Sequence, residues 1–407
     1  MLRADFAIRH AGRLLTMEAR RDDPYGTILD GALAAFLGRV VWVGPDARFE
    51  ANVALAGDAV DAGGCLVTPG LVDAHTHPVF AGSRADEFAE RLSGVAYADQ
   101  QGGERGIQRT VLATRAASED DLVCLAVERA HRFLAHGTTT IEAKTGYGLD
   151  LEQERKLLRV LRRLAALTPL RVIPTFLGAH VVPRGVDRAT YVRTIVEEML
   201  PAFRHQARFC DVWCDAPAFT AAESRAILRR ARELGYGLRM HAAQLGPGEG
   251  PSIGAELAAA SVDHLEYATP AQVQALAAAG TTAVLCPGAA LTVPGSPRPP
   301  LDALREYGVP VAIASDLNPG TCNSESLTFA MSAACVLWGM TPAETLIGAT
   351  RGGARSLGLE GEAGRLGPGH AADCAIFDLE APEEIPYHVG VNRVKTTVVG
   401  GRVVTPP

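Results

Sequence analysis

The stretch Leu66-Val67-Thr68-Pro69-Gly70-Leu71-Val72-Asp73-Ala74-His75-Thr76-His77 places two histidines two residues apart, directly after an apolar run. Residues i and i+2 of an extended chain point to the same face of a strand. Both imidazoles can therefore reach one metal ion from the end of a strand. A metal site needs further ligands and a strand needs neighbours, so the rest of the sequence has to supply both.

Short β-rich runs recur along the middle of the chain, and helical patterns separate most of them. They are Leu66–Val72, Thr138–Ala143, Arg171–Leu177, Phe209–Cys214, Gly237–Met240, Val262–Leu265, Thr282–Cys286 and Pro310–Ala314. Strands that alternate with helices indicate a parallel sheet, and a doubly wound open sheet shares this alternation. The count of eight, with polar residues gathered after the strand ends, favours a TIM-type (β/α)₈ barrel.

Helix signals lie between these runs. Thr220 with Glu223 and Thr341 with Glu344 are typical of capping boxes. Leu151–Leu167 carries leucines at helical spacing. The middle of the chain is therefore predicted to be an α/β barrel.

The two ends of the chain differ from this middle. Residues 1–65 and 366–407 hold short β-like pieces, such as Gly38–Gly44 and Val394–Val399, with Gly400-Gly401 as a hairpin turn. We expect both ends to form one small β-sandwich beside the barrel. The predicted parts are thus the N-terminal sandwich segment 1–65, the metal-dependent barrel 66–365, and the C-terminal sandwich segment 366–407.

Composition excludes several classes of protein. The chain has 407 residues, of which 47% are hydrophobic, and a formal net charge of −7 without a basic stripe, so no nucleic-acid partner is expected. The eight cysteines form no CxxC pair, and most lie in apolar runs, as reduced thiols of a cytoplasmic protein do. Neither a signal peptide nor a membrane span is expected.

Chemistry-bearing residues gather at the predicted strand ends. Besides Lys144 to Tyr147, Gln244 and Asn318, they are His75, His77, His180, His241, His264 and Asp316. We predict that His75, His77, His241 and Asp316 hold one divalent metal ion, because imidazole and carboxylate suit zinc or iron. His264 is the alternative fifth ligand.

The fourth predicted strand, Phe209–Cys214, has no lysine that could be carboxylated to bridge a second ion, which favours a single ion. Asp211 and Cys214 are further candidate ligands, although a structural role is favoured for both.

Several motifs now point to a family. Pro69–His77, the strand-end residues and the sandwich termini resemble the amidohydrolase superfamily. Finer motifs resemble the imidazolonepropionase family; they are Phe80–Arg84, Thr110–Arg115, Glu142–Leu149, Phe176–His180 and Ser315–Gly320. The likeness runs over nearly the whole chain.

This resemblance implies a cytoplasmic, homodimeric enzyme of histidine degradation that needs Zn²⁺ or iron (Fe²⁺ or Fe³⁺). The family hydrolyses 4-imidazolone-5-propanoate to N-formimino-L-glutamate. Its metal ligands fall on the set predicted above. Its substrate contacts fall on Arg84, Tyr147, His180, Gln244, Asn318, Gly320 and Thr321.

The residue types suit such a substrate. Arg84 can bind the propanoate through two parallel hydrogen bonds, the alternative being a surface arginine. Tyr147 offers a hydroxyl and a ring face, and His180 is either a substrate contact or a structural histidine. Gly320 lets the chain approach closely so that its amide reaches the ligand, although Asn-Pro-Gly is also ordinary turn chemistry.

The expected mechanism assigns three catalytic residues. Asp316 accepts a proton from the attacking water and later donates it to the leaving ring nitrogen, while His264 stabilises the oxyanion. Gln244 stands where many relatives, including deaminases, carry a proton-shuttling glutamate, so it can orient the ring but cannot act as the acid. Ala243 stands where an aspartate is expected.

Two other functions compete with this one. The first is another mononuclear cyclic amidohydrolase or aminohydrolase that acts on a different heterocycle. The second is a non-catalytic scaffold with the same fold. The complete ligand set argues against a scaffold, and Arg84 argues for an anionic substrate.

Overall fold

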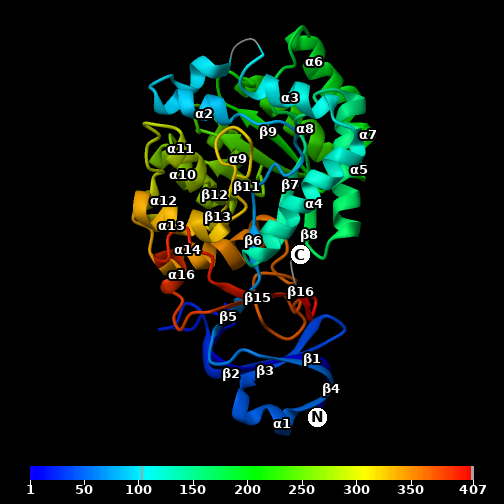
Figure 1. The fold of residues 1–407 in the computed structure, drawn as a ribbon. Helices are drawn as coiled ribbons and strands as arrows, with labels where there is room; N and C mark the ends of the chain where they lie inside the picture. The colour runs from blue at the N-terminus through cyan, green and yellow to red at the C-terminus, as the bar shows by residue number, and fades with distance from the viewer. Residues whose placement is uncertain (102–103, 405–407) are drawn as a thin grey trace.

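The computed structural model describes residues 1–101 and 104–404, and it has two parts (Figure 1). A parallel barrel wrapped by helices makes up the larger part. A second sheet, built from both ends of the chain, lies against one end of the barrel. The described residues contain no helix that is long and apolar enough to span a membrane.

Eight parallel strands form the barrel, in chain order and without a reversal. They are β6 (Leu71–Asp73), β7 (Thr138–Lys144), β8 (Arg171–Ala179), β9 (Phe209–Cys214), β10 (Gly237–Ala242), β11 (Ser261–His264), β12 (Thr282–Leu285) and β13 (Val311–Ile313). The predicted (β/α)₈ architecture is confirmed.

The barrel closes just beyond β6 and β13. Thr76 and Leu317 form a parallel bridge, and the His77 amide donates to the Leu317 carbonyl at 2.8 Å. One step inward, the Asp316 amide donates to the His75 carbonyl at 3.1 Å. The seam between the first and last strands is therefore made by the backbone of the histidine pair and of Asp316.

Helices cover the outside of the barrel (Figure 1). The main ones are α2 (Ala85–Leu92), α3 (Ile107–Ala116), α4 (Glu119–Ala135), α5 (Leu151–Leu167), α6 (Arg188–Thr194), α7 (Leu200–Phe203), α8 (Ala221–Glu233), α9 (Gly250–Glu256), α10 (Pro270–Ala279), α11 (Pro287–Thr292), α12 (Leu301–Glu306), α13 (Leu327–Trp338), α14 (Pro342–Ile347) and α15 (Gly353–Ser356). The capping boxes at Thr220 and Thr341 begin α8 and α14 as predicted, because each hydroxyl accepts from an amide that the helix leaves without a partner.

The terminal sheet also has eight strands, in the order β16-β15-β14-β5-β1-β2-β3, with β4 paired to β1. They are β1 (Leu2–Leu15), β2 (Thr27–Phe36), β3 (Arg39–Pro45), β4 (Val53–Asp61), β5 (Leu66–Pro69), β14 (Cys374–Phe377), β15 (Val394–Val399) and β16 (Arg402–Val404). Gly400 and Gly401, both at positive φ, form the predicted hairpin turn. The predicted association of both ends is confirmed.

The predicted strand Leu66–Val72 is wrong as a single barrel strand. Its first half, β5, pairs with β14 in the terminal sheet, and its second half, β6, begins the barrel. Gly70 separates them where a Cβ atom would lie 2.2 Å from Thr139 Oγ1. Periodicity cannot reveal this change of sheet, because both halves are fully buried. The domain division at 65/66 and 365/366 stays a prediction, and residues 405–407 lie outside the described part.

Candidate metal centre and active-site pocket

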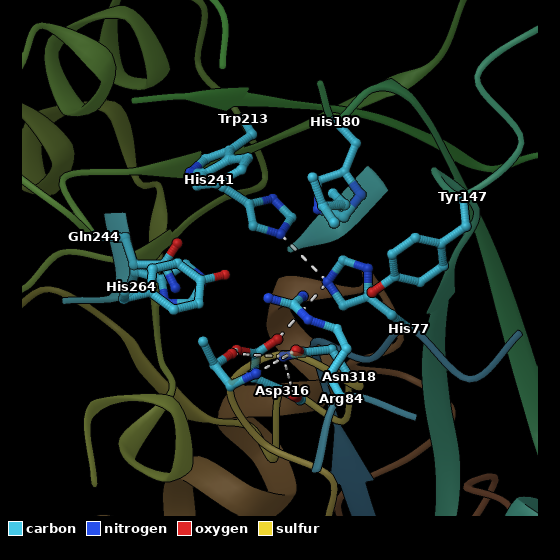
Figure 2. Close-up of a pocket in the computed structure, with 13 residues that line it drawn as sticks. His77, Arg84, Tyr147, His180, Trp213, His241, Gln244, His264, Asp316 and Asn318 are labelled. Carbon is cyan, nitrogen blue, oxygen red and sulfur yellow. Dashed lines mark hydrogen bonds and ion pairs between the residues drawn. The ribbon is translucent and has the colours of Figure 1, made fainter. Parts of the chain in front are cut away.

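A pocket opens at the carboxyl ends of the barrel strands (Figure 2). Its lining residues come from almost every strand end, as expected for this architecture. They are His77, Arg84, Tyr97, Ile107, Tyr147, His180, Trp213, His241, Gln244, His264, Asp316, Asn318 and Thr321.

Three histidines converge beside this pocket. His77 Nε2 lies 3.3 Å from His75 Nε2 and 3.4 Å from His241 Nε2. All three side chains are buried. The predicted i, i+2 pair thus presents its nitrogens to a third imidazole from β10, and the nitrogens lie close enough for one ion to bind them all.

The outer nitrogens of two of these rings face carboxylates. Asp263 Oδ2 lies 2.6 Å from His75 Nδ1, and Asp211 Oδ2 lies 3.0 Å from His241 Nδ1. An Nδ1–H that points to a carboxylate leaves the Nε2 lone pair free to bind a metal. Burial also lowers the pKa of His75 well below its ordinary value, which favours the neutral, ligating form.

Asp316 completes the donor set. Its Oδ1 lies 3.4 Å from His75 Nε2 and 3.7 Å from His77 Nε2. Its backbone adopts φ of +52°, a left-handed conformation that is costly for most residues and that turns the carboxylate towards the histidines. Burial raises the pKa of Asp316 to about 7. Three imidazole nitrogens and one carboxylate, all buried and converging, fit a divalent metal ion.

A second triad, His75, His264 and Cys286, also lies within ligating distance. Burial raises the pKa of the Cys286 thiol well above its ordinary value, whereas metals bind the thiolate. The all-imidazole triad is therefore the better metal site, and His264 is left to line the pocket.

His264 and Gln244 occupy one wall of the pocket. His264 Nδ1 lies 4.0 Å from Glu266 Oε1, and burial lowers the pKa of the ring well below its ordinary value. The backbone amide of Gln244 donates to Asp215 Oδ2 at 3.0 Å. This bond fixes the backbone of Gln244, while the Gln244 side chain faces the cavity.

The opposite wall is aromatic. His180 stacks on His77 with ring centroids 5.2 Å apart, and Tyr147 packs 5.4 Å from His180. Burial lowers the pKa of His180 to about 3, so the ring is neutral. Since its Nδ1 lies 3.1 Å from the Gly146 carbonyl, that nitrogen carries the proton and Nε2 remains a hydrogen-bond acceptor. Trp213, which the sequence did not single out, packs edge-on to His180 at 5.8 Å.

Arg84 directly precedes helix α2 and lines the pocket. Its Nε donates to Glu87 Oε2 at 2.7 Å, and the guanidinium is almost fully buried. Its Nη2 has no hydrogen-bond partner among the described residues. A buried guanidinium with a free donor is suited to an anionic ligand group, so the surface-arginine alternative is wrong.

The loop after β13 is organised by the Asn318 side chain. Asn318 Nδ2 donates to the Asp316 carbonyl, and Oδ1 accepts from the amides of Gly320 and Thr321 at 2.8 and 2.7 Å. Thr321 Oγ1 in turn lies 3.4 Å from Asp316 Oδ2. The Gly320 amide, which we expected to reach the ligand, is thus already used inside the loop.

Gly320 instead makes room for Arg84. A Cβ atom at this position would lie 2.5 Å from Arg84 Nη1. We expect Gly320→Ala to displace the guanidinium and to raise KM for a carboxylate substrate on the order of 10-fold with little change in kcat. Steady-state kinetics check this result. Gly361→Ala, where an added Cβ meets no atom within 4 Å, is the control, and equal KM values for the two variants would contradict it.

Beneath the metal site lies a layer of buried charges, of which the sequence singled out only Lys144 and Asp211. Its members are Glu142 and Lys144 on β7, Asp211 on β9, Arg239 on β10 and Asp263 on β11, all buried. Although burial opposes ionisation, His241 and Lys144 lower the pKa of Asp211 well below its ordinary value. Polar residues at a spacing of two within apolar strands were the signal that could have revealed this layer. Asp211 contacts Lys144 and His241 Nδ1, which agrees with the structural role favoured for it.

Comparison with known proteins agrees with this geometry. The amidohydrolase family model matches residues 66–404. An imidazolonepropionase of Myxococcus xanthus is 44% identical over 98% of this chain and 97% of its own length. One of Paracoccus denitrificans is 43% identical over 97% of this chain and 99% of its own.

Solved structures share the fold at lower identity. Guanine deaminase of E. coli superposes with a TM-score of 0.77 at 18% identity, covering 98% of this chain and 99% of the deaminase. A zinc-bound adenosine deaminase from Xanthomonas campestris gives 0.73 at 19% identity, covering 98% and 93%. With the full-length relatives above 40% identity, these matches mean that the chain belongs to the amidohydrolase family and, within it, to the imidazolonepropionases.

Proposed function

We propose that the chain hydrolyses the ring C–N bond of 4-imidazolone-5-propanoate and releases N-formimino-L-glutamate, a step of histidine degradation. One observation carries this proposal: the pocket that holds the imidazole–carboxylate cluster also holds the buried guanidinium of Arg84. A lactam with a carboxylate tail needs both groups, whereas a neutral heterocycle needs only the first. The relatives named above support the same activity.

His75, His77, His241 and Asp316 would hold one Zn²⁺ or iron ion. Such an ion, when bound, lowers the pKa of water and polarises a carbonyl group. A single ion is favoured because Lys144 Nζ, the lysine nitrogen nearest the site, donates to Glu142 and Asp211 and is engaged as an ammonium. A carboxylated bridging lysine has no counterpart here.

Asp316 moves the proton in the proposed reaction. Its carboxylate accepts a proton from the attacking water as the new C–O bond forms at the lactam carbonyl carbon. It then donates that proton to the ring nitrogen as the C–N bond breaks. Burial raises the pKa of Asp316 and a bound cation opposes this shift, so the same carboxyl group can both accept and release a proton in the reaction.

His264 and Gln244 act on the ring. His264 lies across from the metal-ligand imidazoles, with ring centroids 5.5 Å from His241, and we assign it to the oxyanion of the tetrahedral intermediate. Gln244 offers an amide that can donate and accept, so it orients the ring without exchanging a proton.

The remaining contacts bind the substrate. Arg84 takes the propanoate carboxylate. His180 Nε2 accepts a ring N–H, and Tyr147 packs beside the ring. Asn318, Gly320 and Thr321 shape the loop that seats both Arg84 and Asp316.

A cytoplasmic homodimer is part of the proposal. All eight cysteines are free, which fits a reducing compartment. No contact with nucleic acid or a membrane is proposed, and the small-molecule substrate is the only partner apart from the second copy.

The test uses the purified protein and 4-imidazolone-5-propanoate made from urocanate. We expect loss of the substrate absorbance together with one equivalent of N-formimino-L-glutamate by mass spectrometry. A chelator should abolish turnover, and Zn²⁺ or Fe²⁺ should restore it. Turnover of uncharged heterocycles alone would instead support the alternative cyclic amidohydrolase or aminohydrolase.

A further inference from the structure

Lys144 occupies the centre of the buried charge layer. Its Nζ lies 2.6 Å from Asp211 Oδ2, 2.9 Å from Glu142 Oε1 and 3.7 Å from Asp263 Oδ2. All four side chains have no exposed surface. The ammonium therefore faces three carboxylates from three different barrel strands.

Each of these carboxylates also contacts a metal-ligand segment. Asp263 faces His75 Nδ1, and Asp211 faces His241 Nδ1 while accepting the His241 amide at 3.2 Å. Glu142 Oε2 accepts the amide of Thr76, the residue between the two histidines of the pair, at 3.3 Å. One ammonium thus connects the carboxylates that face the His75 and His241 imidazoles with the one that holds the backbone of the histidine pair.

The choice of lysine at this position fits the geometry. Only three of the 39 basic residues are lysines, namely Lys144, Lys156 and Lys395. A compact ammonium can approach several carboxylates from one point, whereas a planar guanidinium prefers bidentate pairing. The neighbouring Arg239 shows the difference. It donates to the backbone carbonyls of Ala74 and Ser356, and it lies farther from the carboxylates, at 3.3 Å from Asp263 and 3.8 Å from Glu142.

We propose that Lys144 is a positioning residue that sets the metal affinity of the site. It holds two carboxylates against the His75 and His241 imidazoles and a third against the backbone between His75 and His77. The inference rests on the metal site proposed above. Without the ammonium, the Asp211 and Asp263 carboxylates repel each other across the layer. They then move apart, and this movement weakens the Nδ1 contacts that orient His75 and His241.

The experiment measures Zn²⁺ affinity by competition with a chromogenic chelator, and Co²⁺ coordination by visible absorption. Lys144→Met replaces the lysine with an unbranched side chain of similar length that carries no charge. We expect it to weaken Zn²⁺ binding about 10–100-fold and to change the Co²⁺ spectrum. Lys395→Met, a lysine removal in the terminal sheet, should leave both unchanged.

A second variant covers the case in which Lys144→Met does not fold. Lys144→Met/Asp263→Asn removes one charge of each sign, and the new side-chain amide oxygen can still accept from His75 Nδ1. We expect this double variant to bind Zn²⁺ close to as tightly as Asp263→Asn alone, since the repulsion is gone and the two effects are not additive.

Wild-type affinity retained in Lys144→Met, or strictly additive losses in the double variant, would overturn the inference. A wild-type protein that binds no ion would instead overturn the metal site itself. The two failures are therefore distinguishable.

Discussion

Asp316→Asn is expected to lower kcat about 10³-fold, on the order of 4 kcal/mol in activation free energy, because the amide cannot accept the proton of water. Asparagine is the informative replacement, since it tolerates the left-handed backbone at φ of +52°, where alanine is strained. Steady-state turnover of 4-imidazolone-5-propanoate gives kcat.

The pH profile supplies an independent check on the same residue. Burial raises the pKa of Asp316 to about 7, and a bound cation lowers it. Asp316 must be ionised to accept a proton, so wild-type kcat/KM should fall with unit slope as the pH decreases below 7 through this pKa. Asp302→Asn, at an exposed carboxylate, is the control. A fully active Asp316→Asn enzyme would remove Asp316 from proton transfer.

Arg84→Met is expected to raise KM for 4-imidazolone-5-propanoate about 30–100-fold, because a charge-assisted hydrogen-bond pair contributes roughly 2–3 kcal/mol. The effect should be absent for a ring that lacks the propanoate. Comparing kcat/KM for both compounds isolates the carboxylate contact.

Arg109→Met is the matched control for this substitution. Arg109 lies on the neighbouring helix α3, is 43% exposed and pairs with Asp86. It should therefore leave KM unchanged. Equal losses for the two substrates in Arg84→Met would show that Arg84 supports the pocket rather than the carboxylate.

The sequence predicted the barrel, and it predicted that the proposed ligand residues lie together, because both depend on local patterns. Alternating elements imply a parallel barrel, and a barrel brings its strand ends together. His75, His77, His241 and Asp316 had only to stand at strand ends to be expected as neighbours. The capping boxes at Thr220 and Thr341 were equally local.

Other features depend on contacts between distant residues. The close approach of Thr139 to Gly70, at the break between β5 and β6, is such a contact, and periodicity does not reveal it. The role of Gly320 as space for Arg84 depends on two loops more than 200 residues apart. The partners of Lys144 were visible as polar residues within strands. That they meet in one layer became clear only from the position of β7, β9 and β11 in the barrel.

The backbone hydrogen bonds that close the barrel link binding of the metal ion to the stability of the barrel. His75 and His77 follow the first strand and Asp316 follows the last, and their backbone hydrogen bonds join those two strands. An open barrel separates these ligands, so an ion that needs all of them binds only the closed form and opposes its opening. Metal binding and closure of the barrel are therefore thermodynamically linked, and removal of the metal is expected to lower the stability of the whole barrel as well as its activity.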